Sequence, residues 1–164
     1  MLDFSVYYYK GAAYRFDLVR PEQNEQVVKL LREFDPDLNE LTPAEITILL
    51  NQYSTNNTYW LGLTDLATDT LVGVATLFVK RSFTQRRDKE LFGLYADIEQ
   101  VVVAEEARGQ GVGRFMIGLV TDFAAHIGCR KVMLFCNDKN VTFYEKCGFE
   151  KMYNTMRMGL NAQG

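Results

Sequence analysis

The sequence predicts a mixed α/β fold, a central mixed twisted sheet flanked by helices. Apolar runs at residues 59–63, 71–79 and 95–103 are typical of strands, and the first two predict an antiparallel hairpin. Apolar residues with helical spacing follow at 113–127, and another strand pattern lies at 131–136. A strand, a helix and a strand in this order predict a right-handed parallel crossover.

The N-terminal third predicts two further helices and one or two strands. The tyrosines at 7–9 indicate a short strand or an arm that faces a partner, and residues 14–19 alternate like a strand. A helix is expected from Pro21, because proline is favoured at the first helical position, and Asp35-Pro36-Asp37 ends it. Thr42-Pro43-Ala44-Glu45 is a capping box that predicts the start of a second helix.

The C-terminal third predicts a short helix at 141–147 and a last strand at 154–160. The polar segment 82–90 is interpreted as a loop beside the site. The continuous run Val101-Val102-Val103 predicts burial on both faces of the sheet. Because no linker composition interrupts the chain, residues 1–164 are expected to form a single domain.

Composition restricts the classes of function. A net charge of −3 and a pI near 5.2 argue against a nucleic-acid binder. No apolar run approaches the roughly 20 residues that span a membrane, and no signal peptide is visible. Three cysteines without C-x-x-C spacing suit a reducing compartment, so a cytoplasmic location is expected, with organelle import by a signal of unrecognised type as the open alternative. The single histidine, His126, falls late in a helix pattern, so neither a metal nor a histidine base is expected.

A glycine-rich turn, Arg108-Gly109-Gln110-Gly111-Val112-Gly113-Arg114, lies between a strand and a helix. Because glycines have no Cβ atom, a phosphate can approach the backbone of this turn closely. The positive end of the dipole of the following helix also attracts the phosphate. A P-loop would end in Gly-Lys-Ser/Thr, and a dinucleotide motif would have a glycine in place of Met116. The remaining alternative is a glycine-rich helix start that binds nothing. If the empty turn faces solvent, Gly111→Trp should block a ligand and spare the fold.

A tyrosine, Tyr144, is expected at the start of the next helix. A phosphate socket followed by a phenol indicates coenzyme A rather than a nucleotide cofactor. A phenol is a good proton donor to a developing thiolate. The structural alternative is a tyrosine that only packs beside Phe143.

These motifs resemble a known superfamily. Arg108-x-x-Gly111-x-Gly113 is similar to the acetyl-CoA pyrophosphate motif of the GNAT N-acetyltransferases, and Asn140-x-x-Phe143-Tyr144-Glu145-Lys146-x-Gly148-Phe149 resembles the second half of that core. Within GNAT, Ile98-Glu99-x-Val101-x-Val103 and Gly128-Cys129-x-Lys131 resemble the eukaryotic glucosamine-6-phosphate N-acetyltransferases. The close resemblance covers about residues 95–150 and implies the GNAT acyl-CoA N-acyltransferase fold.

The resemblance implies transfer of an acetyl group from acetyl-CoA to the amine of D-glucosamine 6-phosphate. The product, N-acetyl-D-glucosamine 6-phosphate, lies on the route to UDP-N-acetylglucosamine. The resemblance also implies direct amine attack in a ternary complex, no metal, and a homodimer with substrate sites near the interface. Two alternatives remain open: another amine acceptor (a polyamine, an aminoglycoside or a protein N-terminus), or a non-catalytic acyl-CoA-binding module.

The resemblance also assigns the cofactor residues. The backbone of Val101-Val102-Val103, chiefly at Val101 and Val103, is expected to align the pantetheine arm, and residues 108–114 to hold the pyrophosphate. Phe143 and Asn140 are expected to contact coenzyme A, although helix N-capping explains Asn140 equally well. Tyr144 is expected to protonate the coenzyme A sulfur.

For the acceptor amine, the resemblance indicates Glu99 with Gln100 and Val101. Glu99 is expected to hold the amine or to accept its proton through water; the alternative is a solvated or dimer-paired carboxylate. Gln100 stands where the family usually has aspartate, and an acidic residue usual near Phe135 is missing. A backbone carbonyl around Phe135 is the substitute considered for orienting the amine.

For the sugar phosphate, the resemblance indicates Lys131, Arg130 beside it, and Arg157 near the C-terminus. Lys80, Arg81 and the segment 82–85 correspond roughly to a further substrate-binding segment. The alternative for each of these cations is an ordinary surface charge.

Overall fold

The computed structural model describes residues 6–53, 57–82 and 93–152. The strands are β1 (Val6–Tyr9), β2 (Ala12–Leu18), β3 (Thr58–Asp65), β4 (Thr70–Ser82), β5 (Gly93–Val103) and β6 (Cys129–Leu134). The helices are α1 (Asn24–Phe34), α2 (Pro43–Tyr53), α3 (Val112–His126) and α4 (Asp138–Lys146). Short 3-10 turns are η1 (Pro21–Gln23), η2 (Pro36–Glu40) and η3 (Glu105–Ala107).

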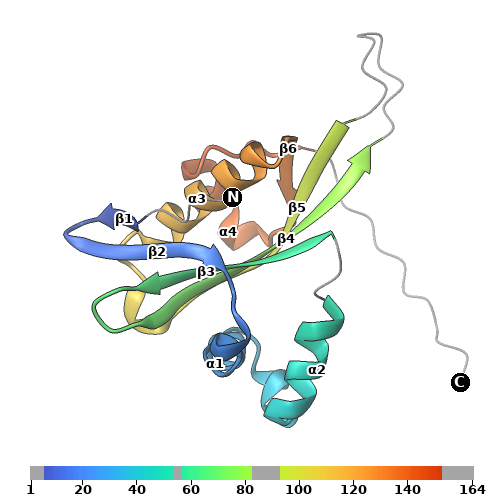
Figure 1. Ribbon diagram of the computed structural model, residues 1–164. Coiled ribbons are helices and arrows are strands. Elements are labelled where there is room, and N and C mark those ends of the chain that lie inside the picture. The colour runs from blue at the N-terminus through green and yellow to red at the C-terminus, as the bar shows by residue number, and fades with distance from the viewer. Residues whose placement is uncertain (1–5, 54–56, 83–92, 153–164) are drawn as a thin grey trace, which may run out of the picture.

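The described strands form one mixed sheet in the order β1-β2-β3-β4-β5-β6, which curls as in Figure 1. Neighbours from β1 to β5 are antiparallel, whereas β5 and β6 are parallel, as the predicted crossover requires. Helix α3 and helix α1 cover opposite faces of the sheet (Figure 1). Because Gly73 of β4 has no side chain, Met116 of α3 can pack against the strand at this position. Its sulfur lies 2.7 Å from where a Cβ of residue 73 would be. This close approach seats α3 on the sheet.

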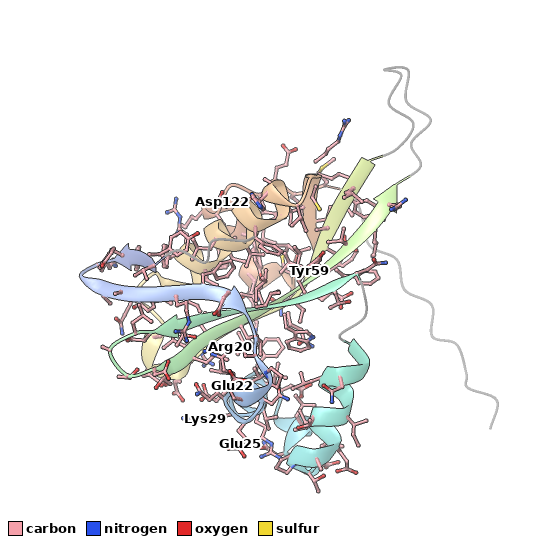
Figure 2. The ribbon with its side chains drawn as sticks, in the orientation of Figure 1. Arg20, Glu22, Glu25, Lys29, Tyr59 and Asp122 are labelled. Atoms are coloured by element: carbon pink, nitrogen blue, oxygen red, sulfur yellow. The ribbon has the colours of Figure 1, made fainter. Side chains whose placement is uncertain are left out.

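The side chains that the apolar patterns predict to be buried are buried in the structure. In α3 the stripe of Met116, Leu119, Val120, Phe123 and Ala124 is buried. On the other face, α1 buries its apolar side and carries Glu25 and Lys29 at the surface away from the sheet, and Glu22 of η1 is exposed beside them (Figure 2). The two helices thereby fix the sheet between two apolar layers.

The predicted helix signals are confirmed, with one difference of detail. The amide of Thr42 donates to Glu45 Oε2 at 2.8 Å and the amide of Glu45 to Thr42 Oγ1 at 3.3 Å, which is a complete capping box. Pro21 opens a 3-10 turn and the α-helix begins at Asn24. The tyrosines at 7–9 form a strand, so the arm interpretation is not needed for them.

Three sequence predictions are wrong in part. Val102 is buried, but Val101 and Val103 are only half-buried, because β6 does not continue beside them. Helix α4 begins at Asp138 rather than at 141. Ser82 belongs to strand β4 rather than to the predicted loop. The expected strand at 154–160 and the rest of the predicted loop, residues 83–90, lie outside the described residues.

No helix in the described ranges has the length and apolar character needed to cross a bilayer.

Candidate active site

The sheet opens at the carboxyl end of β5. Pairing with β6 reaches Ile98–Leu134, whereas pairing with β4 continues to Gly73–Val103. The amide of Ala104 donates to Val72 O at 2.9 Å, so the backbone N–H of Ala104 points toward β4. Because backbone groups alternate sides along an antiparallel strand, Val101 and Val103 direct theirs to the side that β6 has left. An extended ligand can therefore bond to this edge as an added strand does.

A β-bulge marks the point where the opening begins. Leu77 pairs with Ile98 and Thr76 with Gln100, so Glu99 has no opposite residue on β4. Thr76 Oγ1 accepts the Gln100 amide at 3.0 Å and holds the bulge. Glu99 is exposed as a result, and its carboxylate is presented beside the opening.

The glycine turn has the conformation that a phosphate cradle needs. Gly109 and Gly111 have φ of +73° and +86°, in the left-handed region that favours glycine. Gly111 is the N-cap of α3 and supplies no side-chain cap, so the first amides of the helix are left for an external acceptor. Arg108 turns back instead, with Nε donating to Val103 O at 2.9 Å and Nη2 3.7 Å from a Glu33 carboxylate oxygen. Its side chain ties the turn to the end of β5.

The β1–β2 hairpin covers one side of this turn. Lys10 Nζ donates to Gln110 O at 2.8 Å, and Tyr9 stacks on Phe115 with ring centroids 4.6 Å apart. A Cβ at Gly111 would lie 2.3 Å from the Tyr9 hydroxyl oxygen. The expectation that the empty turn faces solvent is therefore wrong on this side, and Gly111→Trp would displace the hairpin as well as block a ligand.

Helix α4 closes the far side of the opening. A Cβ at Gly113 would lie 3.5 Å from the Phe143 ring and 3.6 Å from Val103 Cγ2. Phe143 therefore packs where β5 ends and α3 begins, beside the glycine turn. Asn137 is the N-cap of α4 and Asn140 lies inside the helix, so the N-cap interpretation of Asn140 is wrong.

Tyr144 lies near the end of α4 rather than at its start, because the helix begins three residues earlier than predicted. Its ring meets Phe143 and Phe149 edge-on, with centroids 5.0 Å and 5.9 Å away. Burial, with smaller contributions from the free thiols Cys136 and Cys147, raises the pKa of Tyr144 above its ordinary value of 10.0. The phenol therefore stays protonated at neutral pH, as a proton donor must.

Charged side chains gather around Tyr95 and Asp97 in the middle of β5. Lys80 of β4 pairs with the buried Asp97, and that hydrogen bond holds the pKa of Lys80 above its ordinary 10.5. Lys80 Nζ and Lys131 Nζ lie 6.0 Å and 5.1 Å from the centre of the Tyr95 ring. Aromatic rings attract cations at such distances.

Arg130 lies on the same side of β5 as Lys131. The two strands shift register between Leu94 and Ala96, and a Cβ at Gly93 would lie 3.4 Å from Arg130 Cδ. Residues 93 and 95 point to the same face, so both basic side chains border that face. Arg157 lies outside the described residues.

Sequence reasoning missed Lys10 and Asp97. Lys10 is a hundred positions from Gln110 along the chain, and only the hairpin brings the two together. Asp97 stands two residues before Glu99, and an acidic residue inside an apolar strand pattern is the signal that could have revealed it. Among the described residues, no group of three metal-ligating side chains occurs.

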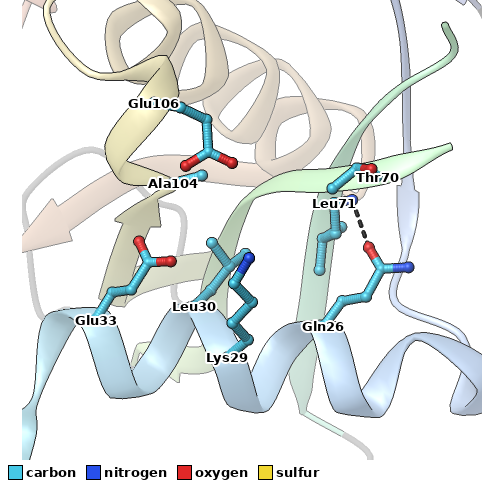
Figure 3. Close-up of a pocket in the computed structure, with 8 residues that line it drawn as sticks. All are labelled: Gln26, Lys29, Leu30, Glu33, Thr70, Leu71, Ala104 and Glu106. Carbon is cyan, nitrogen blue, oxygen red and sulfur yellow. Dashed lines mark hydrogen bonds between the residues drawn. The ribbon is translucent and has the colours of Figure 1, made fainter. Parts of the chain in front are cut away.

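A cavity of about 120 Å³ lies behind the turn, between α1, the start of β4 and η3 (Figure 3). Gln26 Oε1 accepts the Leu71 amide across it at 2.6 Å. Glu33 accepts the Glu105 amide at 3.1 Å beside it. The volume of this cavity is much smaller than the roughly 300 Å³ of ordinary ligand pockets. The cavity lies where α1 packs against the segment that leads into the glycine turn.

Comparison with known proteins gives the family. The model of the acetyltransferase (GNAT) family matches residues 24–149. The chain belongs to the GNAT acetyltransferases. Its curated relatives include glucosamine 6-phosphate N-acetyltransferase of Schizosaccharomyces pombe, 33% identical over 93 residues that cover 57% of this chain and 79% of that protein.

A second relative, glucosamine 6-phosphate N-acetyltransferase 1 of Dictyostelium discoideum, is 32% identical over 97 residues, which cover 58% of this chain and 59% of that protein. Among solved structures, a Trypanosoma brucei acetyltransferase matches with TM-score 0.73 and 24% identity over 90% of this chain and 99% of its own. An aminoglycoside N-acetyltransferase in complex with CoA matches with TM-score 0.73 and 13% identity over 95% of this chain and 100% of its own. These likenesses show the GNAT fold.

Proposed function

We propose that this GNAT acetyltransferase transfers the acetyl group of acetyl-CoA to the amine of D-glucosamine 6-phosphate, giving N-acetyl-D-glucosamine 6-phosphate for UDP-N-acetylglucosamine synthesis. The observation that carries the proposal is the group of cations, Lys80, Lys131 and Arg130, around Tyr95 on the strand that leads to the opening of the sheet. Such a group suits an anionic acceptor and does not suit a polyamine. The names of the curated relatives support the same acceptor.

The residues present fit acetyl-CoA. The open edge at Val101 and Val103 suits the amide-bearing pantetheine arm, and the free amides at Gly111–Arg114 suit a pyrophosphate. Bound acetyl-CoA supplies the reactive thioester. Phe143 and Asn140 of α4 would border the arm between these two groups.

Glu99 is the residue proposed to receive the acceptor amine. The bulge leaves it exposed beside the opening, with the charged pair of Lys80 and Asp97 on the neighbouring strand positions. Attack requires a neutral amine, and a carboxylate takes the amine proton directly or through a water. Gln100 and Val101 would help to orient the amine next to it, and a backbone carbonyl around Phe135, just after β6, would take the place of the missing acidic residue.

Tyr144 is proposed to protonate the departing coenzyme A sulfur. Its raised pKa keeps the proton on the phenol until it is needed. Direct transfer in a ternary complex then needs one base, one acid and the alignment provided by β5. We also propose a homodimer, as the family resemblance implies, together with the cytoplasmic location and the one catalytic domain over residues 1–164 that the sequence predicts.

The test measures coenzyme A thiol release with glucosamine 6-phosphate, glucosamine, spermidine and an N-terminal peptide. Two charge-assisted hydrogen bonds to the phosphate predict a preference of about 10²-fold or more for glucosamine 6-phosphate over glucosamine in kcat/KM. Equal use of both sugars, or a preference for spermidine or peptide, would refute the proposed acceptor. Release with none of the four would favour a non-catalytic acyl-CoA-binding module.

A further inference from the structure

The turn of the β1–β2 hairpin has Lys10 at a position with positive φ, which asparagine or glycine usually occupies. Tyr9 pairs with Ala12, so Lys10 and Gly11 form a two-residue turn, with φ of +49° and +84°. Positive φ at both positions is the type I′ turn, for which Asn-Gly is preferred. A left-handed lysine costs about 1 kcal/mol or more. An unfavourable backbone conformation of this kind directs attention to what the side chain does.

The lysine side chain reaches the glycine turn. Lys10 Nζ donates to Gln110 O at 2.8 Å, and the Tyr9 hydroxyl donates to the same oxygen at the longer distance of 3.5 Å. Tyr9 also holds the hairpin against α3 by stacking on Phe115, with ring planes 8° apart. The described residues include no salt bridge to Lys10. Its positive charge therefore stands uncompensated beside the turn.

The contact determines which way the turn presents its amide. In a planar trans peptide, the C=O of one residue and the N–H of the next point in opposite directions. Because Gln110 C=O points to Lys10, the Gly111 N–H points away from the hairpin. That amide lies at the start of α3, where the helix leaves its first donors free.

Resting on the proposed function, we propose that Lys10 is a positioning residue for phosphate binding in this acetyltransferase. Lys10 fixes the Gln110–Gly111 peptide so that its N–H faces the coenzyme A pyrophosphate. Its ammonium also raises the electrostatic potential at that site. The β1–β2 hairpin is thus part of the cofactor site although it precedes the glycine turn by a hundred residues.

The decisive variant is Lys10→Asn, because asparagine suits the type I′ turn while the ammonium is lost. We expect the KM for acetyl-CoA to rise about tenfold, as for loss of a hydrogen bond to a charged group, with kcat within about twofold. The thermal midpoint should be unchanged or higher. The kcat/KM for S-acetylpantetheine should not change, because this substrate lacks the nucleotide and the pyrophosphate of acetyl-CoA. Lys10→Arg should restore most of the affinity.

Arg20→Gln is the matched control for charge, because Arg20 follows the opposite end of β2 and pairs at the surface with Glu22 (Figure 2). It should leave the KM for acetyl-CoA unchanged. An unchanged KM in Lys10→Asn, or an equal loss with S-acetylpantetheine, would overturn the role of Lys10. Failure of the unaltered protein to acetylate glucosamine 6-phosphate while it still binds acetyl-CoA would instead overturn the proposed acceptor, and acetyl-CoA binding by titration would still test Lys10.

Discussion

The carboxyl end of β5 contributes backbone groups to the site, whereas its middle contributes charged side chains. At Val101 and Val103 backbone groups face the side that β6 has left, although the Val103 carbonyl already accepts from Arg108, and the side chains are apolar and half-buried. At Asp97 the strand is paired with both β4 and β6, and the groups left for a ligand here are the buried carboxylate, the Tyr95 ring and their basic neighbours. The bulge at Glu99 separates the two regions.

The difference teaches which changes each region tolerates. A backbone site depends on conformation, so it is sensitive to glycine replacement and insensitive to the identity of apolar side chains. A site made of side chains depends on charge and on the pairing of buried groups. Tyr144 is the exception, because it places a side-chain function beside the backbone region.

Tyr144→Phe tests this exception and should have the largest effect. If the phenol protonates the sulfur, kcat should fall about 10²-fold or more with little change in acetyl-CoA affinity. In the unaltered enzyme, the midpoint of the activity loss by ionisation of the donor should lie above pH 10.0, because burial raises the pKa of Tyr144. The measurement is the pH profile of kcat for both proteins, and an unchanged kcat in the variant would remove Tyr144 from the mechanism.

Gly111→Ala tests the backbone region by conformation. Alanine at φ +86° is strained by about 1–2 kcal/mol, and its Cβ would also lie 2.3 Å from the Tyr9 hydroxyl. We expect about 2–3 kcal/mol lower unfolding free energy in urea and clearly weaker acetyl-CoA binding. Gly109→Ala is the matched control, since its φ is +73° and nothing lies within 4 Å of its Cβ position. Equal losses in both variants would show that the hairpin contact is unimportant.

Lys80→Met tests the side-chain region and should lower the unfolding free energy by less than Gly111→Ala does. It leaves Asp97 buried without its cation, and because Lys80 is 35% exposed we expect a loss of about 2 kcal/mol. The hydrogen bond to Asp97 raises the folded-state pKa of Lys80. The contribution of Lys80 is therefore complete below its unfolded pKa of about 10.4 and disappears as pH rises through the folded value. Urea unfolding from pH 7 to 11 measures this, and a pH-independent difference between the proteins would contradict the ion-pair explanation.

Much of the fold was predictable because its signals are local. The α3 stripe, the Thr42–Glu45 capping box and the β3–β4 hairpin each arise from residues that are close in sequence. The start of α4 was predicted three residues late, because Asn137 caps the helix without an apolar residue to mark the first turn. The burial of Val101 and Val103 was overestimated, because an apolar run does not show where a neighbouring strand stops.

The sequence by itself determined the glycine turn, the family resemblance and the candidate acid Tyr144, because each depends on residue types at short spacing. Only the tertiary structure decided that β5 and β6 part after Ile98, that Lys10 reaches Gln110, and that Asp97 pairs with Lys80. These features join residues that are distant along the chain. Their contacts depend on strand register and on how the hairpin docks against α3, which no local pattern specifies.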